Sequence, residues 1–370
     1  MSHTATNVKV SRDEDRWEAE ISAEIPSETI AKYREQALKE IQKDAKLDGF
    51  RPGKAPIDRI LQIYGEGPAL RRAAEIAIQE ELPEILASEK LPIVEAPRVT
   101  TDTPEAGKPL SFKARAALAP EIKLGDYKKI AEKHRNTKED ATVTDKEHAE
   151  ALTHLRRERA RIDKIEAGLE PAKAADESRD MKEEDLPAID DEFVQSLGYE
   201  NAEKFGEALR ENMGHEKEGR ALEKVRAGIL DDLVKESKIK YPAALADYEL
   251  DDMEAHMGAD LARIGQTVDS YLAEQKKTRE EMRAMWKDAA DKRAKVRLIL
   301  AEIARQEKLE PSSHDIEHEL SHAKQHYPNV DDQTLFSHIS HAMRNEMVMR
   351  FLDGSPEPEP HDHSHDHDHE

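Results

Sequence analysis

The chain has 370 residues, of which 37% are charged and only 4% aromatic, a composition typical of several small cores joined by long solvated helices rather than of one large enzyme core. Its 80 acidic residues outnumber its 57 basic residues, and the net charge of −23 argues against broad binding to nucleic acid or anionic membranes, which depends on clustered cations. There is no cysteine, no run of about 18 apolar residues that would span a membrane and no apolar signal sequence near the N-terminus, so we expect a cytoplasmic protein without disulfides or thiolate chemistry.

Residues 1–122 have the pattern of a small α+β domain. Apolar residues alternate with polar ones from Trp17 to Ile25, which predicts a strand with one buried face. A charged amphipathic helix is expected at about 29–46, a second helix begins at Pro56, and a third contains Pro83 as a kink. Extended segments follow around 93–100 and 110–118, and this order of elements favours a small sheet with a long helical hairpin.

Residues 123–189 are predicted to form a helical, charged linker. Thr144 and Glu147 make a capping-box pattern that opens a helix extending to about Ile165. Residues 166–187 have the composition of a flexible linker or an exposed loop.

From residue 190 the sequence is nearly all helical, and we predict an elongated all-α domain over 190–354. Helices are expected at about 243–264, 278–309, 313–327 and 331–352, with a break at Tyr241-Pro242 and a capping box of Thr278 with Glu281. Residues 355–370 are predicted to be disordered, and the chain as a whole is expected to be mostly helical.

A turn-forming segment, GFRPGKAP at residues 49–56, separates the first two predicted helices. Pro52 and Gly53 fit the second and third positions of a β-turn, where the glycine supplies a positive φ. Such a turn should hold Phe50, Arg51 and Lys54 outward at the tip of the helical hairpin. An exposed aromatic side chain makes sense where a partner covers it, and the two cations suit carboxylates or phosphates. Residues 30–60 contain eight basic and five acidic residues, so the tip is a local basic island.

This loop, followed by an apolar helix and Tyr64-Gly65, resembles the ribosome-docking loop of bacterial trigger factors, which carries a Gly-Phe-Arg-x-Gly-Lys-x-Pro motif. The resemblance continues in LPAIDDEFVQSLGYENAEKFGEALRENM, residues 186–213, and in Tyr241–Leu245. It implies a ribosome-associated chaperone. The first domain would dock on the large subunit near the polypeptide exit tunnel, on a ribosomal protein and adjacent rRNA, and helical arms would shield nascent and unfolded chains. The predicted docking residues are Gly49, Phe50, Arg51, Pro52, Gly53, Lys54 and Pro56, with Lys43, Lys46 and Arg59 as accessory cations. Whether the free protein forms a homodimer stays open.

Trigger factors usually carry an FKBP-like prolyl isomerase domain between these two regions. Here residues 148–187 contain no Phe, Trp or Tyr and a single glycine, so they cannot line the aromatic pocket that a prolyl amide needs. We therefore predict no isomerase activity. Because no phosphate-binding glycine loop is present either, we expect an ATP-independent chaperone that requires no cofactor.

Client contact is predicted at the methionines of the C-terminal helices, since an unbranched, polarizable side chain adapts to many apolar sequences. The alternative, that each fills an ordinary helix–helix core, stays open. The candidates are Met253, Met257, Met282, Met285, Met343, Met347 and Met349.

Histidines form two patterns. One is a stripe at every fourth residue, in which neighbouring pairs could hold a transition metal weakly, although a solvated stripe is the simpler interpretation; it consists of His314, His318, His322 and His326. The other is the tail, a candidate for weak, non-specific binding of a divalent transition metal through His361, His363, His365, His367 and His369.

Two other interpretations remain open. The first is a peptidyl-prolyl isomerase, as the family label suggests, but the sequence lacks the aromatic-rich domain for it. The second is an acidic helical scaffold or metal buffer that uses the histidine tail, but this leaves the GFRPGKAP loop without a role.

Overall fold

The structure is a computed structural model that describes residues 3–45, 50–51 and 53–356. The chain divides into two compact units, each built from two stretches of sequence: Met1–Gly125 with Ser237–Glu302, and Asp126–Glu236 with Ile303–Glu370. The fold is mostly helical, with a small antiparallel sheet near the N-terminus, as predicted. Among the described residues, no helix is both long and apolar enough to cross a lipid bilayer.

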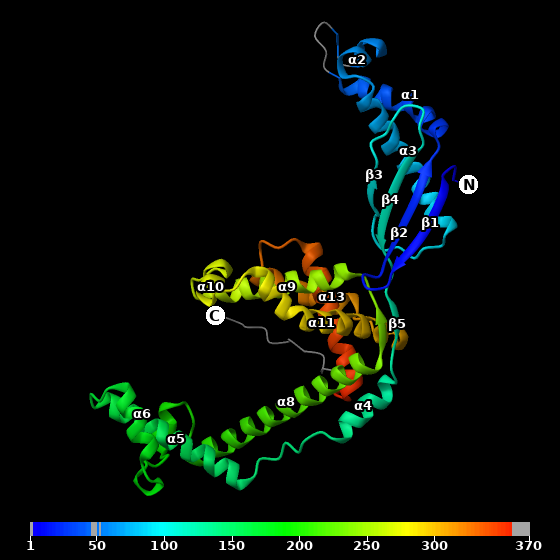
Figure 1. The fold of residues 1–370 in the computed structure, drawn as a ribbon. Helices are drawn as coiled ribbons and strands as arrows, with labels where there is room; N and C mark the ends of the chain where they lie inside the picture. The colour runs from blue at the N-terminus through cyan, green and yellow to red at the C-terminus, as the bar shows by residue number, and fades with distance from the viewer. Residues whose placement is uncertain (1–2, 46–49, 52, 357–370) are drawn as a thin grey trace, which may run out of the picture. The chain divides into compact units, whose positions relative to one another are not determined.

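The sheet of the first unit has four antiparallel strands in the order β1-β2-β4-β3 (Figure 1). The strands are β1 (Thr6–Asp13), β2 (Glu18–Ile25), β3 (Arg98–Thr101) and β4 (Leu110–Ala117). The predicted alternation of β2 is confirmed, because every second residue from Ala19 to Ile25 is buried. In the register of the two central strands, Ile21 faces Ala114 and Ala23 faces Phe112. The first strand was not predicted: it is an edge strand with little burial, so its sequence carries only a weak apolar signal.

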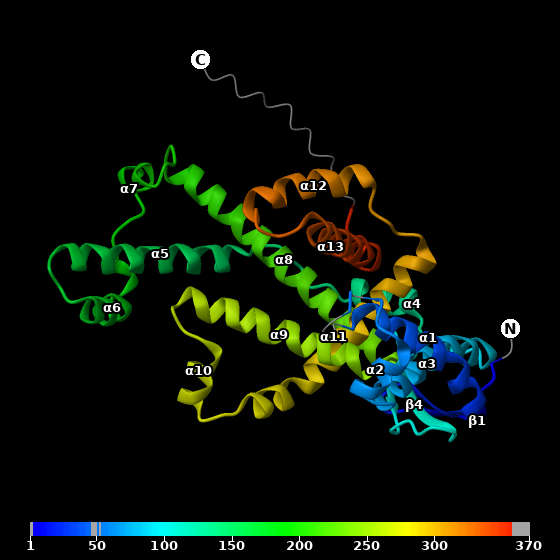
Figure 2. The same ribbon diagram turned by 90° about the horizontal axis from the view of Figure 1, so that it is seen from above.

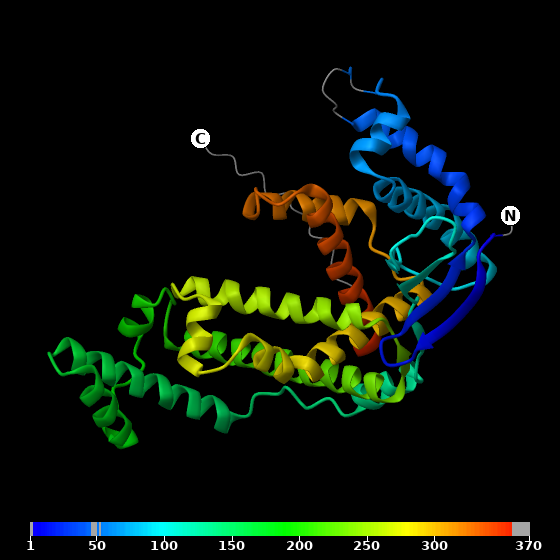
Figure 3. The ribbon, with the colours of Figure 1, turned by 45° about the horizontal axis from the view of Figure 1, so that its top comes forward.

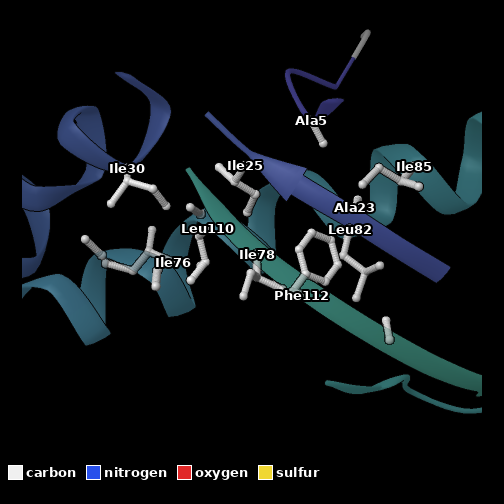
Figure 4. Close-up of a cluster of buried hydrophobic side chains, with 14 of the residues drawn as sticks. Ala5, Ala23, Ile25, Ile30, Ile76, Ile78, Leu82, Ile85, Leu110 and Phe112 are labelled. Atoms are coloured by element: carbon white, nitrogen blue, oxygen red, sulfur yellow. The ribbon is translucent and has the colours of Figure 1, made fainter. Parts of the chain in front are cut away.

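Three helices accompany the sheet: α1 (Ser27–Asp44), α2 (Ile57–Tyr64) and α3 (Gly67–Ser88). Figure 4 shows apolar side chains of α3 meeting those of β2 and β4, with Phe112 among Ile78 and Leu82. Pro83 lies inside α3 without ending it. The sheet and α3 therefore form the core of the N-terminal part.

The first unit also contains a short two-stranded sheet and a helical arm. Strand β5 (Glu121–Lys123) pairs with β6 (Lys238–Lys240), and the arm consists of α9 (Ala243–Arg263), α10 (Val268–Gln275) and the first part of α11 (Arg279–Glu307). Figure 3 shows α9 and α11 running alongside each other and joined at one end by α10. The capping box at Thr278 is confirmed, since Glu281 N–H donates to Thr278 Oγ1 at 3.1 Å and Thr278 N–H donates to Glu281 Oε2 at 2.9 Å. Helix α10 was not predicted.

Arginines of α11 hold carboxylates of α9. Glu249 is only 1% exposed, and its two oxygens lie 3.0 Å from Arg293 Nε and 2.8 Å from Arg297 Nε. Nearer α10, Glu254 pairs in the same way with Arg279 at 2.9 Å and Arg283 at 3.0 Å. These charge-assisted pairs link the two helices along the arm.

The regular secondary structure in the described part of the second unit is all helical. Its framework consists of α4 (Tyr127–Asn136), α8 (Ala202–Glu236), α12 (Ser313–His326) and α13 (Asp332–Asp353), which confirms the two helices predicted at 313–327 and 331–352. One arginine of α8, Arg226, binds both oxygens of Glu346 at 2.9 and 3.0 Å and donates from Nε to Asp353 at 2.6 Å. Because the Asp353 side chain is completely buried, this pair joins α8 to α13 in the interior.

The segment predicted as a flexible linker is folded, and this expectation was wrong. Helix α5 (Asp145–Glu166) is followed by α6 (Pro171–Asp180), the 3-10 turn η1 (Glu183–Asp185) and α7 (Asp191–Ser196), and Figure 2 shows α5, α6 and α7 gathered near the N-terminal end of α8. We call this the α5–α7 module, residues 145–196. Arg156 of α5 donates to three backbone oxygens of the returning chain, those of Glu183, Leu186 and Pro187, at 2.7 to 2.9 Å. Ala174 of α6 and Leu186, which follows η1, are buried. The capping box of Thr144 with Glu147 is confirmed.

Candidate functional site

The GFRPGKAP loop joins the end of α1 to the start of α2 and is fixed at its base. Gln42 of α1 donates from its side-chain amide to the Ala55 carbonyl at 2.6 Å. Ala45, Ala55 and Ile60 are buried together and form a small apolar cluster beneath the loop. The base of the loop therefore has its own core, separate from that of the sheet.

The helices below the loop are tied together by ion pairs. Arg34 of α1 donates to Glu66 at 2.5 Å, and Arg72 of α3 donates to Glu40 of α1 at 2.7 Å. The hydrogen bond from Arg34 holds the pKa of Glu66 below its usual range, and the bond from Arg72 does the same for the pKa of Glu40. Both carboxylates stay charged at neutral pH, which keeps α1 and α3 aligned.

The β-turn predicted at residues 51–54 has the expected geometry. The Lys54 N–H donates to the Arg51 carbonyl at 3.0 Å, and Gly53 has φ of +79°. A positive φ at the third position is the mark of a type II turn and is adopted readily only by glycine or asparagine. Three predicted site residues, Lys46, Gly49 and Pro52, lie outside the described residues.

The tip of the loop presents an apolar side chain and cations to solvent. Phe50 is 41% exposed, and Arg51 and Lys54 are exposed beside it. Within the part of the chain that the structure describes, neither cation forms a side-chain ion pair. The other predicted residues Pro56, Lys43 and Arg59 are also exposed. The arrangement offers one aromatic contact and several positive charges to a partner surface.

Two apolar residues beside the loop were missed by sequence reasoning. Tyr64 was expected on the buried face of α2, but both Tyr64 and Ile63 are exposed. Ile60 is the residue of this helix that is fully buried. The signal was available: ILQIY holds more apolar residues than one face of a two-turn helix can bury. Ile63 and Tyr64 therefore add exposed apolar surface to α2, the helix that follows the loop.

The predicted client-binding methionines fall into two groups. Met282 and Met349 are buried within the protein, so they are removed from the candidates for client contact. Met285 is 66% exposed, and Met253, Met257, Met343 and Met347 are half-buried. Apolar side chains that were not predicted are also exposed on these helices, namely Tyr248, Ile264, Phe336 and Phe351. The exposed apolar surface of these helices is therefore aromatic and aliphatic as well as methionine-containing.

The histidine stripe of α12 lies on the surface. All four histidines are exposed, and the rings of His318 and His322 lie 4.8 Å apart between centroids. Within the described residues, no group of three or more His, Asp or Glu side chains is placed to hold a metal ion. The five tail histidines lie outside the described residues.

Comparisons with known proteins find trigger factors over most of the chain. The family model described as "Bacterial trigger factor protein (TF)" matches residues 6–155, and the one described as "Bacterial trigger factor protein (TF) C-terminus" matches residues 201–351. The trigger factor of Bacillus pumilus is 24% identical, with 84% of this chain and 91% of that protein covered. The trigger factor of Caldicellulosiruptor bescii is also 24% identical, with 84% and 86% covered.

A solved structure from work on "promiscuous substrate recognition in folding and assembly activities of the trigger factor chaperone" has the same fold. It covers 94% of this chain and 99% of its own, at a TM-score of 0.51 and 14% sequence identity. Neither family model matches residues 156–200, the segment that here forms most of the α5–α7 module. Trigger factor family models match both the N-terminal and the C-terminal part of the chain, and the solved trigger factor structure shares its fold. This chain therefore belongs to the trigger factor family.

Proposed function

We propose that this protein is an ATP-independent chaperone that docks on the large ribosomal subunit near the polypeptide exit and shields nascent chains in the cytoplasm. The observation that carries the docking step is the exposed Phe50 beside two cations on a turn closed by a 3.0 Å hydrogen bond. An exposed aromatic side chain with two neighbouring cations suits a site where a ribosomal protein lies next to rRNA phosphates. The solved relative is described as a chaperone, which supports the general activity.

The shielding step rests on the exposed apolar side chains of the helices. Met285, Ile264 and Tyr248 lie on the α9–α11 arm, whose helices are linked by ion pairs. Because ion pairs between α9 and α11 help to hold these two helices together, the exposed apolar side chains of the arm remain available to non-native polypeptides. The charge of −23 opposes self-association of such surfaces.

Co-sedimentation with bacterial ribosomes tests the docking step. The triple variant Phe50→Ala/Arg51→Ala/Lys54→Ala should lose binding, because it removes the aromatic contact and both cations. The matched control, Phe336→Ala/Lys276→Ala/Lys287→Ala, removes one exposed aromatic and two exposed lysines elsewhere and should bind as the wild type does. Equal sedimentation of the loop variant and the wild type would refute docking through this loop.

Suppression of aggregation tests the shielding step separately. A chemically denatured client diluted into buffer without ATP should aggregate less in the presence of this protein. The loop variant should suppress aggregation as well as the wild type, since the loop is not part of the client surface. No suppression by the wild type would refute the chaperone proposal.

A further inference from the structure

The α5–α7 module and α8 enclose an open hollow with a volume of about 470 Å³. Its walls come from α5, from the chain just before α7 and from the first turns of α8, and are predominantly apolar. The volume lies in the range of about 300–1,000 Å³ that is common for ligand sites. The lining residues are His148, Leu152, Ile189, Ala202, Glu203, Gly206, Glu207 and Arg210.

The hollow exists because α8 has small residues where it faces α5. Ala202 and Gly206 are four residues apart and therefore lie on one face of the helix. A Cβ added to Gly206 would meet only His148 Cε1, at 3.9 Å, so the space is not required for close packing of the backbone. Leu152 and Ile189 are half-buried, with part of each side chain open to the hollow. The chain does not fill this space with its own side chains.

Polar contacts hold the walls in place. His148 Nε2 lies 3.0 Å from the Gly206 carbonyl oxygen, which ties α5 to α8. The Ala202 N–H donates to Asp191 at 2.8 Å, and Arg210 donates to Asp145 at 2.7 Å. The site is therefore preformed, which lowers the entropy cost of binding a ligand there.

The rim carries negative charge. Glu203 and Glu207 are exposed at the edge, whereas the nearby cation Arg210 is already paired with Asp145. Lys204 offsets Glu207 in part, at 2.7 Å. An apolar floor with a negative edge is complementary to an apolar side chain that has Lys or Arg as a neighbour.

We propose that this hollow binds an apolar side chain of Leu, Ile or Phe type in an extended, non-native polypeptide, with a Lys or Arg next to it at the rim carboxylates. The proposal rests on the proposed chaperone function and adds a defined client site to it. Seven of the eight lining residues lie in segments that the family models match, and Ile189 comes from the segment that neither model matches.

A photo-crosslinking peptide tests the site on the full chain. The probe is a fluorescein-labelled octapeptide with a central photo-leucine flanked by arginines. Crosslinks should map to residues 148–152, 189 and 202–210. Replacing the arginines with glutamates should weaken binding at least about 3-fold at low salt, because the rim would then repel the peptide. Crosslinks confined to other helices would overturn the proposal.

Variants measured by fluorescence anisotropy give the second readout. Leu152→Ser/Ile189→Ser should weaken peptide binding by about 10-fold, since burying apolar area against these side chains drives it. The control Ile162→Ser/Leu197→Ser removes two exposed apolar residues outside the hollow, one in the module and one directly after it, and should change the affinity less than about 2-fold. Gly206→Leu fills the hollow while favouring the helix, so it gives a third test if the first variant fails to fold. Unchanged affinity in Gly206→Leu would also overturn the proposal.

The outcomes separate this proposal from the proposed function. If the wild type suppresses client aggregation and binds the peptide but the hollow variants bind equally well, the chaperone function stands and the site is refuted. If the wild type neither suppresses aggregation nor binds the peptide, both are refuted.

Discussion

Gly53→Ala tests whether the geometry of the turn at residues 51–54, rather than its composition, determines the proposed ribosome binding. The variant keeps Phe50, Arg51 and Lys54, and a Cβ at this position would have Lys43 Cα as its nearest neighbour, at 3.9 Å. There is room for the methyl group, so the cost is conformational: an L-residue held at φ of +79° costs about 1–2 kcal/mol. That cost lowers the equilibrium constant for forming the turn by about 5–30-fold.

Ribosome affinity should fall by up to the same factor of about 5–30, because only molecules with the formed turn are competent to bind. The measurement is a titration of fluorescently labelled protein with ribosomes. Gly53→Asn should lose less affinity, since asparagine tolerates a positive φ better than alanine does.

Gly107→Ala is the matched control. Gly107 has φ of +74°, no neighbour within 4 Å of an added Cβ, and a place in a turn closed by the Lys108 N–H to the Glu105 carbonyl at 3.2 Å. It imposes the same strain in a loop that is not proposed to dock, so its ribosome affinity should match that of the wild type. Equal affinity of Gly53→Ala and Gly107→Ala would show that the turn conformation is not needed for binding.

Five further outcomes are expected. Arg226→Met should destabilise the second unit by about 3–5 kcal/mol, because it leaves the buried Asp353 carboxylate without its cation. The control Arg220→Met removes an exposed pair with Glu216 and should cost less than about 1 kcal/mol. Hydrogen exchange of α8 and α13 measures the loss of stability in each variant. The Arg226 hydrogen bond lowers the pKa of Glu346 in the folded protein. The contribution of this bond to stability is therefore present above the unfolded pKa of about 4.3 and is lost as the pH falls through the folded pKa. The difference in unfolding free energy between wild type and Arg226→Met should shrink below about pH 4. The purified protein should not accelerate a proline-limited refolding reaction, and clear acceleration would contradict the prediction made from residues 148–187. Met285→Ser should reduce binding of a hydrophobic dye without changing thermal stability, whereas Met282→Ser should lower the melting temperature because that side chain is buried. Removing residues 357–370 should abolish most nickel binding measured by calorimetry, and retention of binding would assign it to α12 instead.

The parts of the fold that were predicted correctly are those that local sequence determines. Alternation from Ala19 to Ile25 is visible because one face of β2 is completely buried. The caps at Thr144 and Thr278 follow from hydrogen bonds between residues three apart, so no tertiary information was needed. The turn at residues 51–54 belongs to the same class, since it depends on Gly53 and a proline.

The errors arose where contacts distant in the sequence decide the structure. The α5–α7 module has the composition of a linker, yet Arg156 bonds three backbone oxygens about 30 residues away and stabilises the return of the chain. Burial of methionines was equally unpredictable. Met282 and Met285 lie three residues apart on α11, but one is buried and the other largely exposed because of what packs on each side of the helix. Periodicity alone does not distinguish these two environments.

Arginine contacts explain how a chain with 4% aromatic residues maintains long helices and still exposes apolar side chains. In the α9–α11 arm, Arg293 and Arg297 enclose Glu249, and in the second unit Arg226 binds Asp353 and Glu346. A planar guanidinium satisfies two carboxylate oxygens or several carbonyls in one fixed geometry, which lysine cannot do. Helices joined in this way need fewer apolar side chains between them than a helix pair joined by a hydrophobic seam. Ile264 and Met285 can then remain on the surface without loss of the fold, which is the condition that a surface for non-native polypeptides must meet.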